Sequence, residues 1–460
     1  MDQSTTNGVS PYQLYKHYNL TIHMIQNLRL STFKTSKITL LKKITGIALS
    51  LILMACEQPQ KPALNEKTKF NKQATKNTLT NSPYGLDATF NYPNFSGQYP
   101  VASIEMTLTD NSRIETLDEK NLTKLESQFG PRKFNIRFYY PSADVALDRI
   151  ALDRVALDYK NSSARLPVIS KTSWANLIGP QKINNKMLRY SNYANAFWDI
   201  KLNQKPSNKQ ADFPLLIFSH GYGFSPEAYT ALSAELASQG FIVISINHTF
   251  GANPTALHQS VSNPTIENIQ WAKELPREDI GRYLPTWSDD QIFVIEELIR
   301  LNGDFKSPFY NKLNLSQLGI FGHSYGGAAS YLTAARDPRV KAIMDIDGTL
   351  FEAKEFDLYQ PFAFIHSKNH QPEYKIDKLN SEAFLIKLEQ FEHVSFTDHI
   401  LWWQWDHGDL KLNQGEINSL QAVETTSQLV QSFFNHYLSG SEESWIQPLT
   451  SNSKKIEQLK

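Results

Sequence analysis

Ser324 stands in the pattern Gly-x-Ser-x-Gly, with Gly322 before it and Gly326 after it. A mostly apolar run over residues 318–321 precedes the pattern and small residues follow it, which predicts a strand, a tight turn and a helix. In such a nucleophile elbow the turn lifts the serine hydroxyl out of the sheet, and the glycines avoid collisions between neighbouring backbones. The helix points its free N–H groups at the reacting centre. The pattern therefore predicts a serine nucleophile for acyl transfer.

A serine nucleophile needs a base, and the base needs an acid that orients it. In this type of site the chain order is serine, then aspartate or glutamate, then histidine, all at the carboxyl ends of strands. Asp347 directly follows a strand predicted over residues 340–346, so it is the favoured acid. Asp345 lies inside the same strand and stays open as the alternative.

Six histidines follow in the remaining chain: His366, His370, His393, His399, His407 and His436. His393 comes shortly after a strand predicted over residues 383–388, so its loop can carry the imidazole back to the elbow. His366 follows the preceding strand and is the main alternative, whereas His436 is expected on the solvated side of the last helix. His393 is therefore the favoured base.

The turn after a strand predicted over residues 213–218 could supply an oxyanion hole. Gly221 and Gly223 allow the backbone to bend tightly on either side of Tyr222. We expect the backbone N–H of Tyr222 to pair with that of Tyr325, which follows the serine. The alternative is a tight strand-to-helix turn without a role in the chemistry.

Strands and helices alternate along the chain, which predicts a doubly wound, mostly parallel α/β sheet. Antiparallel strands are expected first, at residues 101–109 and 133–140. Further on, Ser288 to Gln291 read as a capping box that opens a helix ending near Gly303. Other helices are predicted at residues 227–238, after the elbow, and at 417–438.

Composition narrows the class of protein. The chain has 460 residues, and its 46 Lys and Arg balance its 46 Asp and Glu, so no global field attracts nucleic acid. The single cysteine, Cys56, excludes an intrachain disulfide and a thiolate metal cluster.

The N-terminal segment has the pattern of an export signal. Basic residues precede an apolar run at residues 44–55, which is too short to span a bilayer comfortably. The run ends Leu-Met-Ala-Cys and resembles a bacterial lipobox, so we expect a lipid on Cys56 and a start at Met1 or Met24. The residue after Cys56 is Glu57 and not an aspartate, which favours an anchor in the outer membrane if the cell has one. The alternative is a buried helix with an ordinary cysteine.

These patterns divide the chain as follows: a signal peptide at residues 1–55, a flexible tether at 56–82, an α/β-hydrolase domain at 83–445 with irregular cap insertions at about 141–210 and 248–285, and a polar tail at 446–460.

Five segments together resemble the plasma/type II platelet-activating-factor acetylhydrolases of the α/β-hydrolase superfamily, in a bacterial lipoprotein form: residues 213–223, 236–243, 322–328, 345–347 and 393–398. The resemblance runs from about residue 97 to 438 and implies a lipid-degrading serine esterase without a metal or other cofactor. It implies the triad Ser324, Asp347 and His393, with an oxyanion hole at Tyr222 and Tyr325.

The resemblance also implies short acyl esters as substrates, such as 1-alkyl-2-acetylglycerophosphocholine. Bulky side chains near the site could shorten an acyl channel, and five tryptophans are candidates: Trp174, Trp198, Trp402, Trp403 and Trp405. A general carboxylesterase or polyester hydrolase with the same triad is the alternative function. A catalytically silent binding module would have no need of all three triad residues.

Overall fold

A computed structural model describes residues 95–115, 130–142, 165–167, 197–202, 205–207, 213–252, 255–256, 269–270, 280–401, 415–441, 445–446 and 454–460. All of them belong to one compact unit, Tyr84–Lys460.

One large sheet organises this unit. It has 11 strands in the order β13-β12-β11-β10-β9-β5-β6-β2-β1-β4-β3. The strands are β1 Val101–Ile114, β2 Pro131–Pro141, β3 Arg165–Pro167, β4 Phe197–Leu202, β5 Pro214–Ser219, β6 Ile242–Asn247, β9 Asn314–His323, β10 Ala342–Ile346, β11 Phe362–Ser367, β12 Ala383–Leu388 and β13 Lys454–Gln458. A separate pair, β7 Thr255–Ala256 and β8 Ile269–Gln270, is antiparallel.

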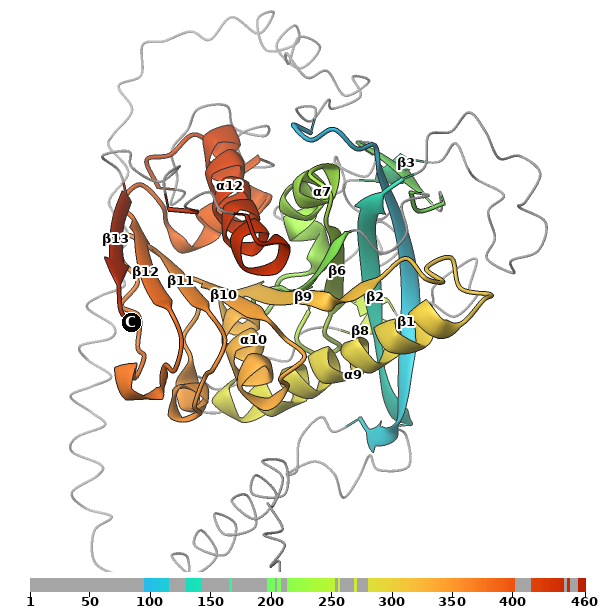
Figure 1. The fold of residues 1–460 in the computed structure, drawn as a ribbon, viewed down its shortest axis with the longest axis horizontal. Coiled ribbons are helices and arrows are strands. Elements are labelled where there is room, and N and C mark those ends of the chain that lie inside the picture. Colours follow the sequence, from blue (N-terminus) through green and yellow to red (C-terminus); the bar gives the residue numbers. More distant parts are fainter. Residues whose placement is uncertain are drawn as a thin grey trace, which may run out of the picture. The chain divides into compact units, whose positions relative to one another are not determined.

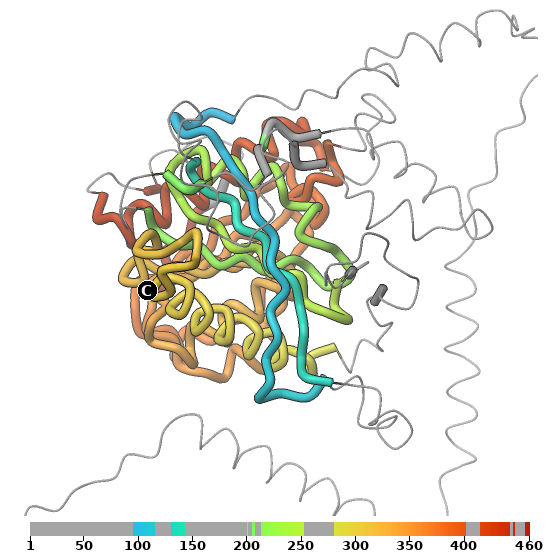
Figure 2. The backbone as a smooth tube through the Cα atoms, turned by 90° about the vertical axis from the view of Figure 1, so that its right-hand side faces the viewer, coloured from blue at the N-terminus to red at the C-terminus, as the bar shows by residue number. Residues whose placement is uncertain are grey.

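The middle of the sheet is parallel from β12 to β6. Strands β2 and β1 continue it in antiparallel pairing, and Figure 2 shows them side by side along the molecule. Full burial on both faces explains why β5, β6, β10 and β11 are mostly apolar. The prediction of a mostly parallel sheet with antiparallel opening strands is confirmed.

Helices cover both faces of the sheet (Figure 1). Helices α7 Thr230–Ser238 and α12 Ser419–Ser439 bury one core, and α9 Leu284–Gly303 and α10 Tyr325–Arg336 bury the other. Short 3-10 helices complete the described elements: η4 Pro226–Tyr229, η6 Gly281–Tyr283, η7 Phe351–Glu355, η8 Ile376–Lys378 and η9 His393–Phe396. The arrangement leaves the carboxyl ends of the parallel strands in register.

Helix α9 begins at Leu284, so the predicted capping box at Ser288 is wrong. A proline lies in the first turn, where its missing N–H breaks no helical hydrogen bond. Ser288 is fully buried, and its hydroxyl accepts hydrogen bonds from Arg336 Nη1 at 2.7 Å and Thr333 Oγ1 at 2.9 Å. The polar residues that suggested a helix start instead serve a buried network.

The predicted polar tail at 446–460 needs a correction as well. Strand β13 pairs antiparallel with β12 and extends the sheet at its edge. The insertion at about 141–210 contributes β3 and β4, and β4 lies beside β1 in the sheet. That insertion is therefore not wholly irregular, because part of it extends the opposite end of the sheet.

Several predictions concern residues outside the described ranges: the signal peptide, the tether, Cys56 and four of the tryptophans, Trp174, Trp402, Trp403 and Trp405. Trp198 lies in β4. Among the described residues, no helix is both long enough and apolar enough to cross a bilayer.

A buried ion cluster joins α9 to the antiparallel strands. The carboxylate of Asp290 is fully buried and lies 2.6 Å from Arg132 Nη2 and 2.9 Å from Arg113 Nη2. Arg132 also pairs with Glu115 at 2.7 Å. Burial alone would raise the pKa of Asp290, but Arg132 and His248 outweigh it and hold that pKa below the usual range.

We predict that Asp290→Asn lowers the free energy of unfolding by about 3–5 kcal/mol, because it leaves the buried Arg132 and the partly buried Arg113 without their shared carboxylate. The neighbouring Asp289→Asn should cost less than about 1 kcal/mol, since the Asp289 side chain, which pairs with Arg336, is 36% exposed and solvent screens its charge. The measurement is urea unfolding of both variants at neutral pH.

The effect should depend on pH in one direction. A carboxyl group with a lowered folded pKa stabilises the fold above its unfolded pKa, about 3.9, and this contribution is lost as the pH falls towards the folded value. The gap between wild type and Asp290→Asn should therefore narrow below about pH 4. Equal losses in the two variants at neutral pH would contradict this account of the cluster.

Candidate active site

Ser324 occupies a strained turn between β9 and α10. Its φ of 55° and ψ of −123° are rare for a residue with a side chain. A Cβ atom at Gly322 would collide with the backbone of Gly326, and one at Gly326 would collide with the carbonyl of Ser219. The strand, the turn and the helix of the predicted nucleophile elbow are therefore present, and the two glycines are needed where the pattern has them.

Asp347 follows the end of the neighbouring strand, β10, and also has a positive φ, 56°. The backbone N–H of Ser324 donates to the carbonyl of Ile346 at 2.7 Å, which ties the elbow to that strand. The carboxylate of Asp347 accepts hydrogen bonds from the N–H of Ser367 at 2.6 Å and from its hydroxyl at 3.0 Å. Its position is thus fixed by β10 and β11 together.

His393 begins the short helix η9 after β12. Its Nδ1 lies 2.6 Å from Oδ2 of Asp347. Burial alone would raise the pKa of Asp347, but the hydrogen bond and charge of His393 outweigh it, so the pKa of Asp347 is lowered and the group accepts. Nδ1 of His393 therefore donates, which leaves Nε2 to exchange a proton with a neighbour. The His393 side chain is 44% exposed, so solvent and ligands can reach it.

Asp345 and His366, the alternative acid and base left open by the sequence, have other partners. Asp345 is fully buried in β10, where its Oδ1 accepts from the N–H of Gly348 at 3.0 Å and burial raises its pKa well above the usual range. His366 bonds through Nδ1 to the carbonyl of Ser367 at 3.1 Å. The carboxylate that bonds to His393 is thus Asp347.

The turn after β5 approaches the serine closely. A Cβ atom at Gly221 would lie 3.2 Å from Cβ of Ser324. The aromatic rings of Tyr222 and Tyr325 meet edge to face at 5.5 Å. Tyr325 is the first residue of α10, where backbone N–H groups lack a carbonyl one turn before them. The two residues predicted to supply oxyanion N–H groups therefore both lie next to Ser324.

His323 and Tyr229 join these loops, and the sequence analysis missed both. Nε2 of His323 lies 3.0 Å from the carbonyl of His393, and Nδ1 lies 2.8 Å from the Tyr229 hydroxyl. That hydroxyl also accepts from the N–H of Gly221 at 3.1 Å. Burial lowers the pKa of His323 well below the usual range, so its ring is neutral, donates at Nε2 and accepts at Nδ1.

His323 stands inside the Gly-x-Ser-x-Gly pattern, and this position next to Ser324 was the signal in the sequence that could have pointed to a role for His323 in the site. Nothing local marks Tyr229 as its partner.

His323, Asp347 and His393 are also residue types that can bind metals, and three of their donor atoms lie within 4.8 Å of one another. Two of these residues share the 2.6 Å hydrogen bond, and both nitrogens of His323 are engaged as described. These hydrogen bonds favour proton transfer over metal binding as the role of the three residues. The expectation that no metal takes part stays a prediction.

Comparison with known proteins gives the family. The family model described as platelet-activating factor acetylhydrolase, isoform II, matches residues 84–276 and 293–455. The platelet-activating factor acetylhydrolase of Cavia porcellus is 28% identical over 254 residues, which are 49% of this chain and 58% of that protein. The Bos taurus protein of the same name is 26% identical over 260 residues, which are 49% of this chain and 57% of that protein. The chain thus spans little more than half the length of these relatives.

A probable 1-alkyl-2-acetylglycerophosphocholine esterase of Arthroderma benhamiae is 25% identical over 142 residues, which are 30% of this chain and 32% of that protein. Among solved structures, a ferulic acid esterase from Streptomyces cinnamoneus matches with a TM-score of 0.61 and 22% identity, over 81% of this chain and 100% of that one. This likeness concerns the fold and agrees with an α/β-hydrolase sheet. Because the family model matches most of the sequence, the chain belongs to the platelet-activating factor acetylhydrolase, isoform II, family.

Proposed function

We propose that the protein is a serine ester hydrolase in which Ser324, Asp347 and His393 form the catalytic triad. The observation that carries this proposal is the 2.6 Å hydrogen bond between Asp347 and His393 beside the strained elbow of Ser324. The names of the relatives, acetylhydrolases and an esterase, support the same reaction class.

In the proposed first step, Oγ of Ser324 attacks the ester carbonyl while Nε2 of His393 takes the hydroxyl proton. Asp347 holds the imidazole in the tautomer that can accept this proton and stabilises the imidazolium that forms. The N–H groups of Tyr222 and Tyr325 donate to the negative oxygen of the tetrahedral intermediate.

The intermediate then collapses to an acyl-serine, and the departing alcohol takes the proton from His393. Water attacks the acyl-serine in the second half of the reaction, with the same histidine as base, and releases the acid and the free serine. The reaction needs no electron transfer.

We propose short acyl esters as the substrates, including phospholipids of the 1-alkyl-2-acetylglycerophosphocholine type. The relatives' names point to this class. Aromatic rings also pack around the proposed oxyanion hole. The ring centre of Trp287 lies 6.2 Å from that of Tyr222 and 4.8 Å from that of Tyr325. The ring centre of Phe351 lies 5.8 Å from that of Tyr325. Rigid rings beside the reacting carbonyl limit the length of acyl chain that fits.

For location, we propose an exported protein held at a membrane, the outer one where two exist, by a lipid on Cys56. The support is in the sequence, where a 12-residue apolar run ends at this cysteine and a polar segment follows it.

Ser324→Ala should lower turnover of a p-nitrophenyl ester by about a thousandfold or more, because the nucleophile is lost. Asp347→Asn should lower kcat by a similar factor, since an amide can hold the wrong tautomer of His393. The measurements are steady-state kinetics and labelling of the serine by a fluorophosphonate probe.

Two variants serve as controls for these losses. Asp345→Asn should retain most activity, because a buried carboxyl with a raised pKa resembles a neutral amide. Ser316→Ala changes an exposed serine on the same strand as the elbow and should have no effect. More than a tenth of wild-type activity in folded Ser324→Ala, or a larger loss in Asp345→Asn than in Asp347→Asn, would overturn the assignment.

We expect kcat/KM to fall steeply between acetyl or butyryl esters and palmitoyl esters, because the aromatic rings shorten the acyl site. The assay is a series of p-nitrophenyl esters from about two to sixteen carbons, together with short-chain phosphatidylcholines. A preference for long chains would indicate a lipase. Activity on simple esters with none on phospholipids would indicate a general carboxylesterase or polyester hydrolase.

Cys56→Ser, expressed with its signal segment in a bacterial host, should release the protein from the membrane fraction or block its maturation. Only the thiol can carry the lipid, so the serine variant tests the anchor directly. Wild type fractionated in parallel is the control, and an unchanged membrane fraction for the variant would refute the anchor.

A further inference from the structure

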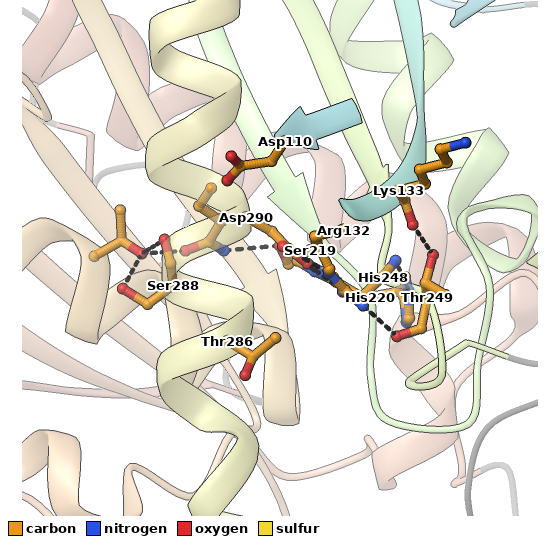
Figure 3. Close-up of polar contacts among 12 residues, drawn as sticks. Asp110, Arg132, Lys133, Ser219, His220, His248, Thr249, Thr286, Ser288 and Asp290 are labelled. Atoms are coloured by element: carbon orange, nitrogen blue, oxygen red, sulfur yellow. Dashed lines mark hydrogen bonds and ion pairs between the residues drawn. The ribbon is translucent and has the colours of Figure 1, made fainter. Parts of the chain in front are cut away.

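A second serine, histidine and aspartate are hydrogen bonded in series in the core, outside the proposed triad (Figure 3). Oγ of Ser219 lies 2.8 Å from Nε2 of His248, and Nδ1 of His248 lies 2.9 Å from Oδ2 of Asp290. All three residues are fully buried, so no substrate reaches them. We call them the buried relay.

The chemistry of its members fixes the direction of each hydrogen bond in the buried relay. Asp290 stays ionised beside Arg132, so it accepts, and Nδ1 of His248 donates to it. Burial lowers the pKa of His248 to about 4 despite this bond, so the neutral ring accepts at Nε2. The Ser219 hydroxyl therefore donates to His248, and its oxygen accepts from Gln291 Nε2 at 2.7 Å.

Packing holds the ring of His248 as firmly as these bonds do. Trp287 stacks on His248 with ring centres 3.9 Å apart and an angle of 11°. The same tryptophan packs edge to face against Tyr325 and lies parallel to Tyr222. The buried relay thus lies directly behind the aromatic rings that surround the proposed oxyanion hole.

His220 connects the buried relay to the turn. The backbone N–H of His248 donates to Nε2 of His220 at 3.2 Å, so this nitrogen is an acceptor. Burial lowers the pKa of His220 to about 3, and the neutral ring carries its proton on Nδ1. Nδ1 lies 2.7 Å from the carbonyl of Gly221 and donates to it. That carbonyl also accepts from the N–H of Phe224 at 3.0 Å.

The orientation of one carbonyl decides the orientation of an N–H group. In a planar trans peptide the C=O of Gly221 and the N–H of Tyr222 point in opposite directions. This peptide rotates about ψ of Gly221 and φ of Tyr222, and Gly221 has no Cβ atom to resist the rotation. A flipped peptide would present its carbonyl oxygen to the developing oxyanion and would repel it.

We infer that His220 is a positioning residue, which holds the Gly221–Tyr222 peptide with its N–H towards the reacting centre. The backbone N–H of His248, in the buried relay, keeps His220 in the tautomer that donates from Nδ1. The inference rests on the proposed function, because it assigns the Tyr222 N–H to the oxyanion hole.

Two substitutions of His220 separate its two nitrogens. The amide of asparagine attaches at the same carbon as Nδ1, so His220→Asn keeps a donor for the Gly221 carbonyl. The amide of glutamine reaches only the place of Nε2, so His220→Gln loses that donor. Loss of an oxyanion donor lowers kcat by about 100- to 1000-fold. We expect about 10- to 100-fold for glutamine, with KM within about threefold, and near-normal kcat for asparagine.

Equal losses of kcat in the two variants, or a change confined to KM, would overturn the inference. If the glutamine variant does not fold, His220→Ala replaces it, because alanine also lacks the donor and needs no extra space. Wild-type kcat in folded His220→Ala would overturn the inference as well.

Crystal structures of the asparagine and glutamine variants read the orientation of the Gly221–Tyr222 peptide without any assay. The inference requires a change with glutamine and none with asparagine. If wild type hydrolyses no ester, the proposed function fails, while these structures still test whether His220 controls the peptide.

Discussion

The backbone strain at Ser324 is the constraint around which the rest of the structure is arranged. A residue with a side chain at a φ of 55° costs about 1–3 kcal/mol and persists only where its surroundings hold it. Here β9 lies between β5 and β10, so both neighbours contribute: Gly326 packs on the Ser219 carbonyl, and the Ser324 N–H bonds to Ile346. The two neighbouring strands at the centre of the sheet therefore hold the strained turn at Ser324 in place.

Histidines are used in this protein in two distinct ways. His220, His248 and His323 are buried, neutral and bonded at both nitrogens, so each acts as a fixed connector between a donor and an acceptor. His393 is partly exposed and has a carboxylate on one nitrogen. Exposure and partners thus distinguish these three connectors from His393, whose Nε2 is left to exchange protons with a ligand.

The sequence predicted the parts of the site that depend on local pattern. Glycine spacing located the elbow at Ser324, and strand ends located Asp347 and His393. It failed where partners distant in sequence decide the structure. Ser288 resembled a helix cap because the sequence does not show its partners on α10. The connection from Tyr229 through His323 to His393 depends on how η4, β9 and η9 meet.

Strand β13 has a consequence for self-association. It covers the outer edge of β12, where the N–H and C=O groups of a parallel sheet would otherwise be open to another chain. Strand β12 is largely buried and mostly apolar, so a chain cut before Lys454 would present an edge that favours pairing with a second copy. By pairing with β12, strand β13 thus prevents intermolecular β-sheet formation at this edge.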